Sequence, residues 1–301
     1  MYEVITGMFR TVFSILVIGY LGLVACESNP VGGGTDIAAP RRRLLGEVRL
    51  DARMMPPAGV YVWLEGFNLG QKTAADGRFE FVLPPPLAQS GGRGVSGAFN
   101  IYYFMANFRL AVTPVQVING DLVYSTDQID ADGELRIPKT LSQRLRIGTS
   151  MQPYSVRNSD INVTAGKTDF LVRVNVTLQA VRDSVIVFFP RKVGPTFNPL
   201  LFRNVATNET KIFGSAIAGF VASDIDTIDS VPVVRTLVVP IFPDDLEPGE
   251  YEIIPYLLIQ DQQVPEALIE SLGIDVLILG ESYINLPMLR QADPLTFRVE
   301  P

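Results

Sequence analysis

The sequence contains no histidine and one cysteine, Cys26. Zinc sites in proteins usually use histidine or several cysteines as ligands, and acyl-transfer triads usually use histidine as the base. Neither arrangement is available in this chain. Catalysis would therefore need carboxylates, lysine, tyrosine or a metal held by carboxylates. These absences favour a protein that is not an enzyme and needs no cofactor, with a carboxylate-based hydrolase as the less favoured alternative.

The chain also lacks an excess of basic residues. It has 25 Lys and Arg against 32 Asp and Glu, which gives a formal net charge of −7. An acidic chain binds the phosphate backbone of nucleic acids poorly, so no nucleic-acid partner is expected. Apolar residues make up 47% of the 301 residues, which indicates well-filled cores, and the length favours two domains.

A hydrophobic run long enough for a spanning helix is missing from the N-terminus. The apolar run from Thr11 to Ala25 has 15 residues and is interrupted by Ser14 and two glycines. A transmembrane helix usually needs about 20 apolar residues. A run of this length is typical of the core of a signal peptide.

The apolar run ends in "LVAC", which resembles the lipobox of bacterial lipoproteins. The matching residues are Leu23, Val24, Ala25 and Cys26. The resemblance implies that residues 1–25 are a cleaved signal peptide and that Cys26 carries diacylglycerol and a fatty acid such as palmitate. A buried free cysteine or a plain signal peptide is the alternative, since a lone cysteine has no internal disulfide partner.

The residue after Cys26 is Glu27 and not aspartate. In Gram-negative lipoproteins, aspartate at this position retains the protein in the inner membrane, so the resemblance implies the outer membrane. Residues 26–43 are rich in Gly, Pro, Ser and Asn and are predicted to form a flexible tether. Arg41, Arg42 and Arg43 end it, either as a solvated run of charge or in contact with lipid phosphates.

From Leu44 onward the pattern is typical of β-strands. In "GVYVWLEGF", Val60, Val62 and Leu64 are expected on one face of a strand, with Tyr61 and Trp63 on the other. An Asp-Gly pair then predicts a tight hairpin turn at residues 76–77, because glycine tolerates positive φ.

Phe79 and Phe81, after this turn, are expected to point into a core. A second pair, Asp132-Gly133, precedes Leu135 and Ile137 and predicts a similar hairpin, with both side chains directed inward.

The stretch from Leu44 to Pro86 resembles the carboxypeptidase-regulatory-like domain, a transthyretin-like (prealbumin-like) β-sandwich. The matching residues are Gly46, Val48, Ala58, Gly59, Val60, Val62, Thr73, Asp76, Gly77, Phe79 and Phe81. The resemblance implies a non-catalytic sandwich over residues 44–150. The chain departs from the family pattern by inserting "PLAQSGGRGVSG" at Pro86–Gly97, which we expect to be a mobile contact surface.

The second half predicts another sandwich, over residues 151–301. "FLVRVNVTL" alternates, with Phe170, Val172, Val174, Val176 and Leu178 expected on one face. "LEPGEYEI" resembles the corner of fibronectin type III and bacterial Ig-like domains, which implies that the Tyr251 hydroxyl bonds backbone near Leu246. "VPEALIESLG" predicts a short helix with Pro265 at its first position and Gly273 after its end, capping an open end of the sandwich.

Two acidic stretches are candidates for a calcium site. Asp127, Asp130 and Asp132 lie in "DQIDADGE", whose oxygen ligands resemble the start of a calcium loop, although an ordinary hairpin turn explains them as well. "SDIDTIDS" is predicted to be a second acidic loop. The aromatic residues Trp63, Tyr102, Tyr103 and Phe104 form either a sugar-binding platform or part of a core.

These patterns together predict an all-β fold of two β-sandwich domains, transthyretin-like and then Ig-like, behind a lipoprotein signal peptide and tether. The expected role is non-catalytic binding or scaffolding at the bacterial cell envelope, with the membrane bound through the lipid on Cys26 and an envelope protein or glycan as partner. The alternative is a glycan-binding accessory lipoprotein of an outer-membrane transporter. No cofactor is expected apart from the possible calcium.

Overall fold

The protein is described by a computed structural model of the full chain. It describes residues 41–51, 57–125, 127–157, 163–164, 167–168, 170–192, 200–213, 221–242, 245–260, 263–273, 281–288 and 294–301. These residues belong to one compact unit, Arg41–Pro301. They form mostly β-strands, with one short α-helix among the described elements, so the predicted all-β sandwich fold is confirmed. Of the helices within the described ranges, none is both long enough and apolar enough to cross a bilayer.

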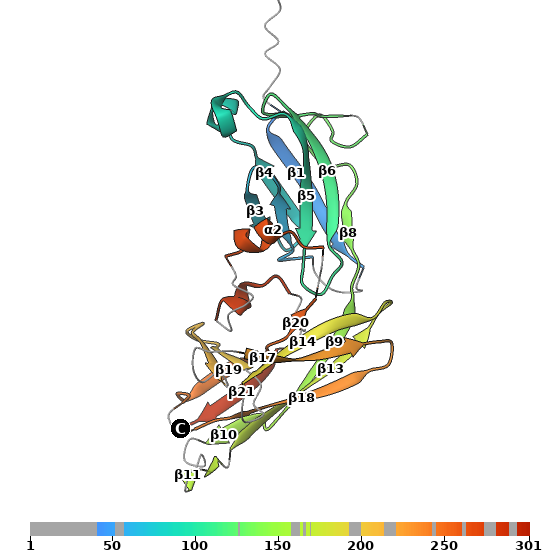
Figure 1. Ribbon diagram of the computed structural model, residues 1–301. Coiled ribbons are helices and arrows are strands. Elements are labelled where there is room, and N and C mark those ends of the chain that lie inside the picture. Colours follow the sequence, from blue (N-terminus) through green and yellow to red (C-terminus); the bar gives the residue numbers. More distant parts are fainter. Residues whose placement is uncertain are drawn as a thin grey trace, which may run out of the picture. The chain divides into compact units, whose positions relative to one another are not determined.

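The first sandwich has a three-stranded and a five-stranded sheet (Figure 1). The smaller sheet has the order β4-β1-β8, with β1 (Arg43–Leu50), β4 (Arg78–Val82) and β8 (Lys139–Leu141). The larger sheet has the order β3-β2-β5-β6-β7, with β2 (Tyr61–Leu64), β3 (Leu69–Lys72), β5 (Gly97–Phe104), β6 (Ala111–Ile118) and β7 (Asp121–Leu122). Their facing side chains enclose one core, which includes Leu44, Val48, Val62, Phe81, Ile101 and Val115.

The first Asp-Gly turn forms as predicted, but it does not make a hairpin. Gly77 has φ +84°, and a Cβ there would lie 2.3 Å from the carbonyl oxygen of Val48. However, β3 before the turn pairs with β2, and β4 after it pairs with β1. The pair Asp76-Gly77 therefore turns the chain from one sheet to the other, because turn residues specify a local reversal and not the partner of each strand. Phe79 and Phe81 are buried in the core as predicted.

The second Asp-Gly turn is followed by only part of the predicted pattern. Gly133 has φ +86°, and Leu135 is buried. Ile137 is 78% exposed, so its predicted inward orientation is wrong. The described residues directly around this turn are paired by two isolated bridges, Leu45 to Glu134 and Ile129 to Leu135. Without a continuous strand, the alternation of faces does not extend to residue 137.

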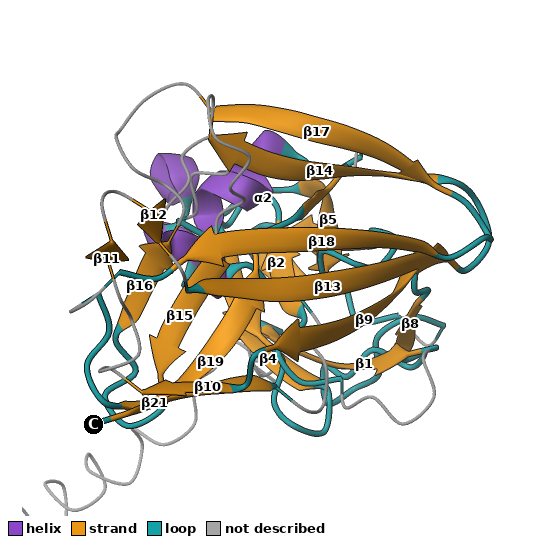
Figure 2. Ribbon diagram, turned by 90° about the horizontal axis from the view of Figure 1, so that it is seen from below, coloured by secondary structure: helices purple, strands orange, loops and turns teal. Residues whose placement is uncertain are grey.

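The second sandwich is built from three larger groups of strands (Figure 2). One sheet has the order β18-β13-β9, with β9 (Leu145–Gln152), β13 (Leu171–Ala180) and β18 (Val233–Pro240). The next has the order β10-β21-β19-β15-β16, with β10 (Ser155–Arg157), β15 (Leu200–Asn204), β16 (Thr210–Phe213), β19 (Gly249–Pro255) and β21 (Leu295–Glu300). The third has the order β17-β14-β20, with β14 (Val185–Lys192), β17 (Val221–Ile228) and β20 (Leu258–Ile259).

Several short elements complete the described part of the chain. They are the two-residue strands β11 (Val163–Thr164) and β12 (Lys167–Thr168), the 3-10 helices η1 (Pro86–Ala88), η2 (Ser90–Gly92) and η4 (Glu281–Asn285), and the α-helix α2 (Glu266–Ser271). The whole of β9 pairs with β13. Residues on both sides of position 150 therefore lie in one strand of the second sandwich, and the predicted domain boundary at 150 stays a prediction.

The core of the second sandwich confirms the alternation predicted from the sequence. Val172, Val174, Val176 and Leu178 have no exposed surface, and Phe170 packs against the same core. The predicted acidic loop at 223–230 is wrong, since most of it is strand β17. Its Asp226 forms a two-point ion pair with Arg235 of β18, which is the main reason that the pKa of Arg235 is raised.

The predicted tyrosine corner is present. Tyr251 in β19 is 3% exposed, and its hydroxyl donates a hydrogen bond of 2.9 Å to the backbone carbonyl of Glu247. The acceptor is the residue after Leu246, near which the bond was predicted.

Replacing Tyr251 by phenylalanine should lower the free energy of unfolding by about 1–3 kcal/mol, because the ring stays buried while the Glu247 carbonyl loses its partner. Chemical denaturation measures the change. Tyr154→Phe is the matched control, since Tyr154 is 62% exposed, and it should leave the stability unchanged. Equal midpoints for Tyr251→Phe and the unaltered protein would show that this hydroxyl contributes nothing.

A third hydrophobic cluster joins the two sandwiches. From the first sandwich it takes Tyr61, Trp63, Phe104 and Ala106. From the second sandwich, including residues between β20 and β21, it takes Leu201, Ile254, Tyr256, Leu268, Tyr283 and Leu286. We call this set the shared cluster. The alternation in β2 is therefore as predicted, but both faces of that strand are buried, one in the first core and the other in the shared cluster.

Helix α2 belongs to the shared cluster. It begins at Glu266, with Pro265 as the N-cap and not as the first helical residue, and Gly273 follows its end with φ +65°. Leu268 has no exposed surface, and the Tyr61 hydroxyl lies 3.0 Å from the Ser271 hydroxyl. The helix therefore packs where the two sandwiches meet.

Candidate binding cleft

The predicted lipidation site cannot be placed in the fold. Leu23, Val24, Ala25 and Cys26 lie outside the described residues. The lipid on Cys26 and the location in the outer membrane stay predictions.

The predicted calcium residues form a backbone turn. The Asp130 carboxylate accepts hydrogen bonds from the backbone N–H groups of Asp132, at 3.0 Å, and Glu134, at 2.9 Å. Asp127 and Asp132 are exposed. Within the described ranges, no three His, Cys, Asp or Glu side chains are grouped so that they could hold a metal ion. A side chain that bonds the following N–H groups is typical of an Asx turn, and the calcium site stays a prediction.

The aromatic residues considered as a sugar platform are part of the protein interior. Trp63, Tyr103 and Phe104 are 4%, 1% and 5% exposed. The half-buried Tyr102 packs against Trp63, with ring centroids 5.6 Å apart. Burial raises the pKa of Tyr103 to about 12. The interpretation as core is confirmed, and a sugar platform made of these rings is wrong.

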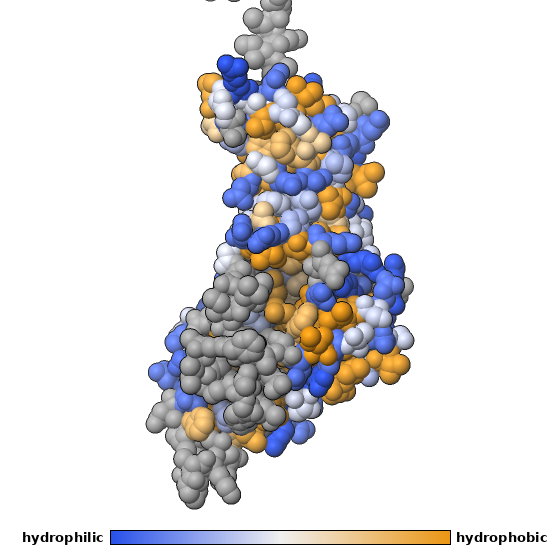
Figure 3. Space-filling view, viewed as in Figure 1, coloured by the Kyte–Doolittle hydropathy of each residue, from blue (hydrophilic) through white to orange (hydrophobic). Residues whose placement is uncertain are grey.

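The insertion at Pro86–Gly97 is held in place by one buried side chain. Gln89 is 7% exposed, and its amide nitrogen donates to the carbonyls of Pro84, at 2.7 Å, and Gly120, at 2.9 Å. Its amide oxygen accepts from the backbone N–H of Val95 at 2.9 Å. Leu87 beside it is 85% exposed. Figure 3 shows hydrophobic side chains next to strongly hydrophilic ones at this end of the first sandwich, where Figure 1 places η1 and η2. The insertion is thus bonded to its neighbours and presents one large apolar side chain, and its mobility stays a prediction.

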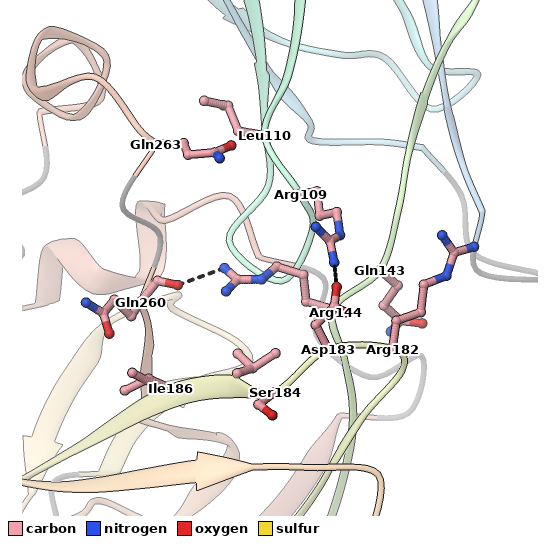
Figure 4. A pocket seen from close by; sticks show the side chains of 11 residues that line it. Arg109, Leu110, Gln143, Arg144, Arg182, Asp183, Ser184, Ile186, Gln260 and Gln263 are labelled. Carbon is pink, nitrogen blue, oxygen red and sulfur yellow. Dashed lines mark hydrogen bonds and ion pairs between the residues drawn. The ribbon is translucent and has the colours of Figure 1, made fainter.

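A cleft of about 400 Å³ lies where loops of the two sandwiches meet (Figure 4). Arg109 and Leu110 come from the connection between β5 and β6, and Gln143 and Arg144 from the connection between β8 and β9. The turn between β13 and β14 adds residues 182–184, and the segment after β20 adds Gln260 and Gln263.

Asn107 ties two of these loops together. It is 2% exposed, its side-chain nitrogen donates to the Leu145 carbonyl at 2.7 Å, and its side-chain oxygen accepts from the Leu145 N–H at 2.9 Å. The backbone N–H of Arg144 donates to the Asn107 carbonyl at 2.9 Å, and the N–H of Val181 donates to the Arg144 carbonyl at 2.9 Å. The backbone that carries the cleft residues is thus fixed by buried hydrogen bonds.

The cleft carries an excess of positive charge. Three arginines line it, at positions 109, 144 and 182, and Asp183 is the one carboxylate among its described lining residues. Arg109 forms an ion pair with Asp183, and Arg144 donates to the Gln260 carbonyl at 2.8 Å (Figure 4). Arg182 is exposed and has no hydrogen-bond or ion-pair partner among the described residues. The cleft therefore has net positive charge in a protein whose formal net charge is −7.

Sequence reasoning did not identify this cleft. Arg109 and Arg144 are 35 positions apart, and Arg144 and Arg182 are 38 positions apart. None of the three arginines is in a recognisable motif. Only the packing of the two sandwiches brings them together.

No protein-family model matches the chain. No curated protein matches it either. Among solved structures, a single-residue mutant of the shaft pilin SpaA from Lactobacillus rhamnosus GG shares 10% identity, with 72% of this chain and 89% of the pilin covered and a TM-score of 0.29. The structure of the pilin without that mutation gives 10% identity, 75% and 89% coverage and a TM-score of 0.26. At such TM-scores the resemblance carries no conclusion about this chain.

Proposed function

We propose that this is a non-catalytic binding or scaffolding protein of the bacterial cell envelope, held at the membrane by a lipid on Cys26. The observation that carries the binding role is the insertion at Pro86–Gly97, which is bonded to its neighbours. Gln89 fixes this loop to two neighbouring segments, while Leu87 stands 85% exposed. A loop that is ordered before it meets a partner loses little conformational entropy on binding. Burial of the Leu87 side chain against a protein partner would contribute favourable free energy.

The shared cluster supports the scaffolding role. Buried side chains of both sandwiches pack together, and the Tyr283 hydroxyl bonds the Leu257 carbonyl at 2.8 Å within the same region. Large hydrophobic contact between domains restricts their relative motion. The protein would then act as a stiff support in which the two sandwiches keep a fixed arrangement relative to each other.

Site-specific cross-linking in whole cells tests the binding role. A photo-reactive phenylalanine analogue at the exposed Arg93, inside the insertion, should give a cross-linked product with one envelope protein. Leu87→Asp should remove this product, because a charge replaces the apolar contact. Ile137→Asp is the control, since Ile137 is 78% exposed in the same sandwich but outside the insertion, and it should leave the product unchanged. Products that are the same in all three proteins would contradict the proposal.

Cys26→Ser tests the anchor. The variant should accumulate as uncleaved full-length chain without incorporated fatty acid, because the thiol is the acceptor for the diacylglycerol. Ser28→Ala is the control and should be processed normally. Metabolic labelling with a fatty acid followed by mass spectrometry measures both proteins, and equal labelling of the Cys26→Ser chain would refute lipidation.

The structure bears differently on the two alternative functions, a carboxylate-based hydrolase and a glycan-binding lipoprotein. A carboxylate hydrolase needs two carboxyl groups about 5–10 Å apart around a bound substrate. Asp183 is the one carboxylate among the described residues of the cleft, and it is paired with Arg109. The buried aromatic side chains do not support glycan binding, but the polar cleft is a different place where a glycan could bind.

A further inference from the structure

We propose that the cleft between the two sandwiches binds an anionic saccharide, that is, a sugar carrying carboxylate or phosphate groups. This inference does not depend on the lipid anchor or on the insertion. It rests on the three arginines of the cleft, on its neutral polar groups and on the buried hydrogen bonds that fix the backbone of its loops.

The arginines select for negative charge. A guanidinium matches a carboxylate or a phosphate with two parallel hydrogen bonds, and such charge-assisted bonds are stronger than neutral ones. In Figure 4 the guanidinium groups of Arg144, Arg109 and Arg182 follow one another across the view. Arg182 is the cation of this set without a hydrogen-bond or ion-pair partner among the described residues, so it is the one that should engage a ligand first.

The neutral groups favour a saccharide over an acidic peptide. The side-chain amides of Gln143 and Gln260 line the same cleft and have no hydrogen-bond partner among the described residues. An amide offers both donors and an acceptor, as sugar hydroxyl groups require. Leu110 and Ile186 add apolar surface to the lining of the cleft, which suits the C–H face of a sugar ring.

The Asp183 carboxylate competes with an anionic ligand for the guanidinium of Arg109. It is 74% exposed and pairs with Arg109, which is 53% exposed. Two further carboxylates bond residues of the cleft: Asp229 accepts a hydrogen bond from the Ser184 hydroxyl, and Asp51 accepts one from the Gln143 backbone N–H at 2.8 Å. An exposed ion pair contributes little to stability, so a ligand can displace Asp183 from Arg109 at small cost.

The test is calorimetric titration of the purified full chain in detergent with four probes: trigalacturonate, glucose 6-phosphate, maltotriose and a triglutamate peptide. We expect trigalacturonate or glucose 6-phosphate to bind at least tenfold more tightly than maltotriose. The tighter of the two anionic sugars identifies carboxylate or phosphate as the preferred group. Affinity should fall as salt is added, because exposed charges are screened.

Two variants with opposite expected effects separate binding from misfolding. Arg182→Gln should lower the affinity for the anionic sugar by roughly three- to tenfold, because it removes one charge-assisted hydrogen bond and keeps a polar side chain. Asp183→Asn should strengthen binding, because it removes the competing charge from Arg109, and a folding defect cannot produce a gain of affinity. Arg182→Lys should keep part of the affinity, and Arg136→Gln, at an exposed site outside the cleft, should keep all of it.

Several results would overturn the proposal. If maltotriose bound as tightly as the anionic sugars, the negative charge of the ligand would not be needed for binding. Binding of triglutamate as tight as that of the anionic sugars would assign the cleft to an acidic protein segment instead. Absence of binding by every probe, or affinities unchanged in both Arg182→Gln and Asp183→Asn, would show that the cleft is not a site for anionic saccharides. None of these results bears on the lipid anchor or on the insertion.

Discussion

Replacing Phe297 by alanine is expected to lower the free energy of unfolding by about 3–5 kcal/mol, the range for a large aromatic side chain removed from a core. Phe297 has no exposed surface, and its ring packs against Phe202, with centroids 6.1 Å apart, and Phe170, with centroids 6.2 Å apart. The substitution would leave a cavity between β21, β15 and the start of β13. Denaturant unfolding followed by far-ultraviolet circular dichroism measures the loss.

Arg298→Ala is the matched control for Phe297→Ala. Arg298 is the next residue in the same strand, and its side chain is exposed on the opposite face. It should change the stability by less than about 0.5 kcal/mol, as is usual for surface positions. Similar losses in the two variants would mean that β21 contributes through its backbone pairing and not through the packing of its ring.

Leu268→Ala is expected to cost about 2–5 kcal/mol and to loosen the contact between the two sandwiches. Leu268 has no exposed surface and lies in the shared cluster with Trp63. Trp63 is the only tryptophan of the chain, so its fluorescence reports on this cluster alone. In the unaltered protein, fluorescence and circular dichroism should show one common unfolding midpoint. In the variant, the fluorescence transition should occur at a lower denaturant concentration than the circular dichroism transition.

Glu270→Ala is the control for Leu268→Ala, because Glu270 lies on the same short helix with an exposed side chain. It should leave the two midpoints coincident. If fluorescence and circular dichroism already gave separate midpoints in the unaltered protein, the shared cluster would not couple the two sandwiches. The scaffolding part of the proposed function would then lose its support.

The sequence was sufficient to predict the features that depend on local pattern. The alternation from Val172 to Leu178 identified the core face of β13, because successive side chains of a strand point to opposite faces whatever the strand pairs with. The corner at Tyr251 was also predictable from a short motif. Its hydroxyl bonds a carbonyl only four residues earlier, so the contact is local in the sequence.

Features that depend on distant segments were not predictable. Asp76-Gly77 indicated a turn but not that β3 and β4 belong to different sheets. The alternation in β2 placed Tyr61 and Trp63 on one face, yet could not show that the second sandwich covers that face. The cleft is the clearest example, because Arg109, Arg144 and Arg182 meet only after both sandwiches have packed.

The position of β21 within its sheet has a consequence for the order of folding. This strand lies between β10 and β19, and its pairing with β10 joins Ser155 to Arg298. A chain that leaves the ribosome or a membrane channel from its N-terminus cannot complete this sheet until residue 300 has emerged. Until then the edges of β10 and β19 are unpaired, and such edges can bind other chains. The first sandwich has its complete set of strands much earlier, so the second sandwich is the part that needs protection while the protein is being made.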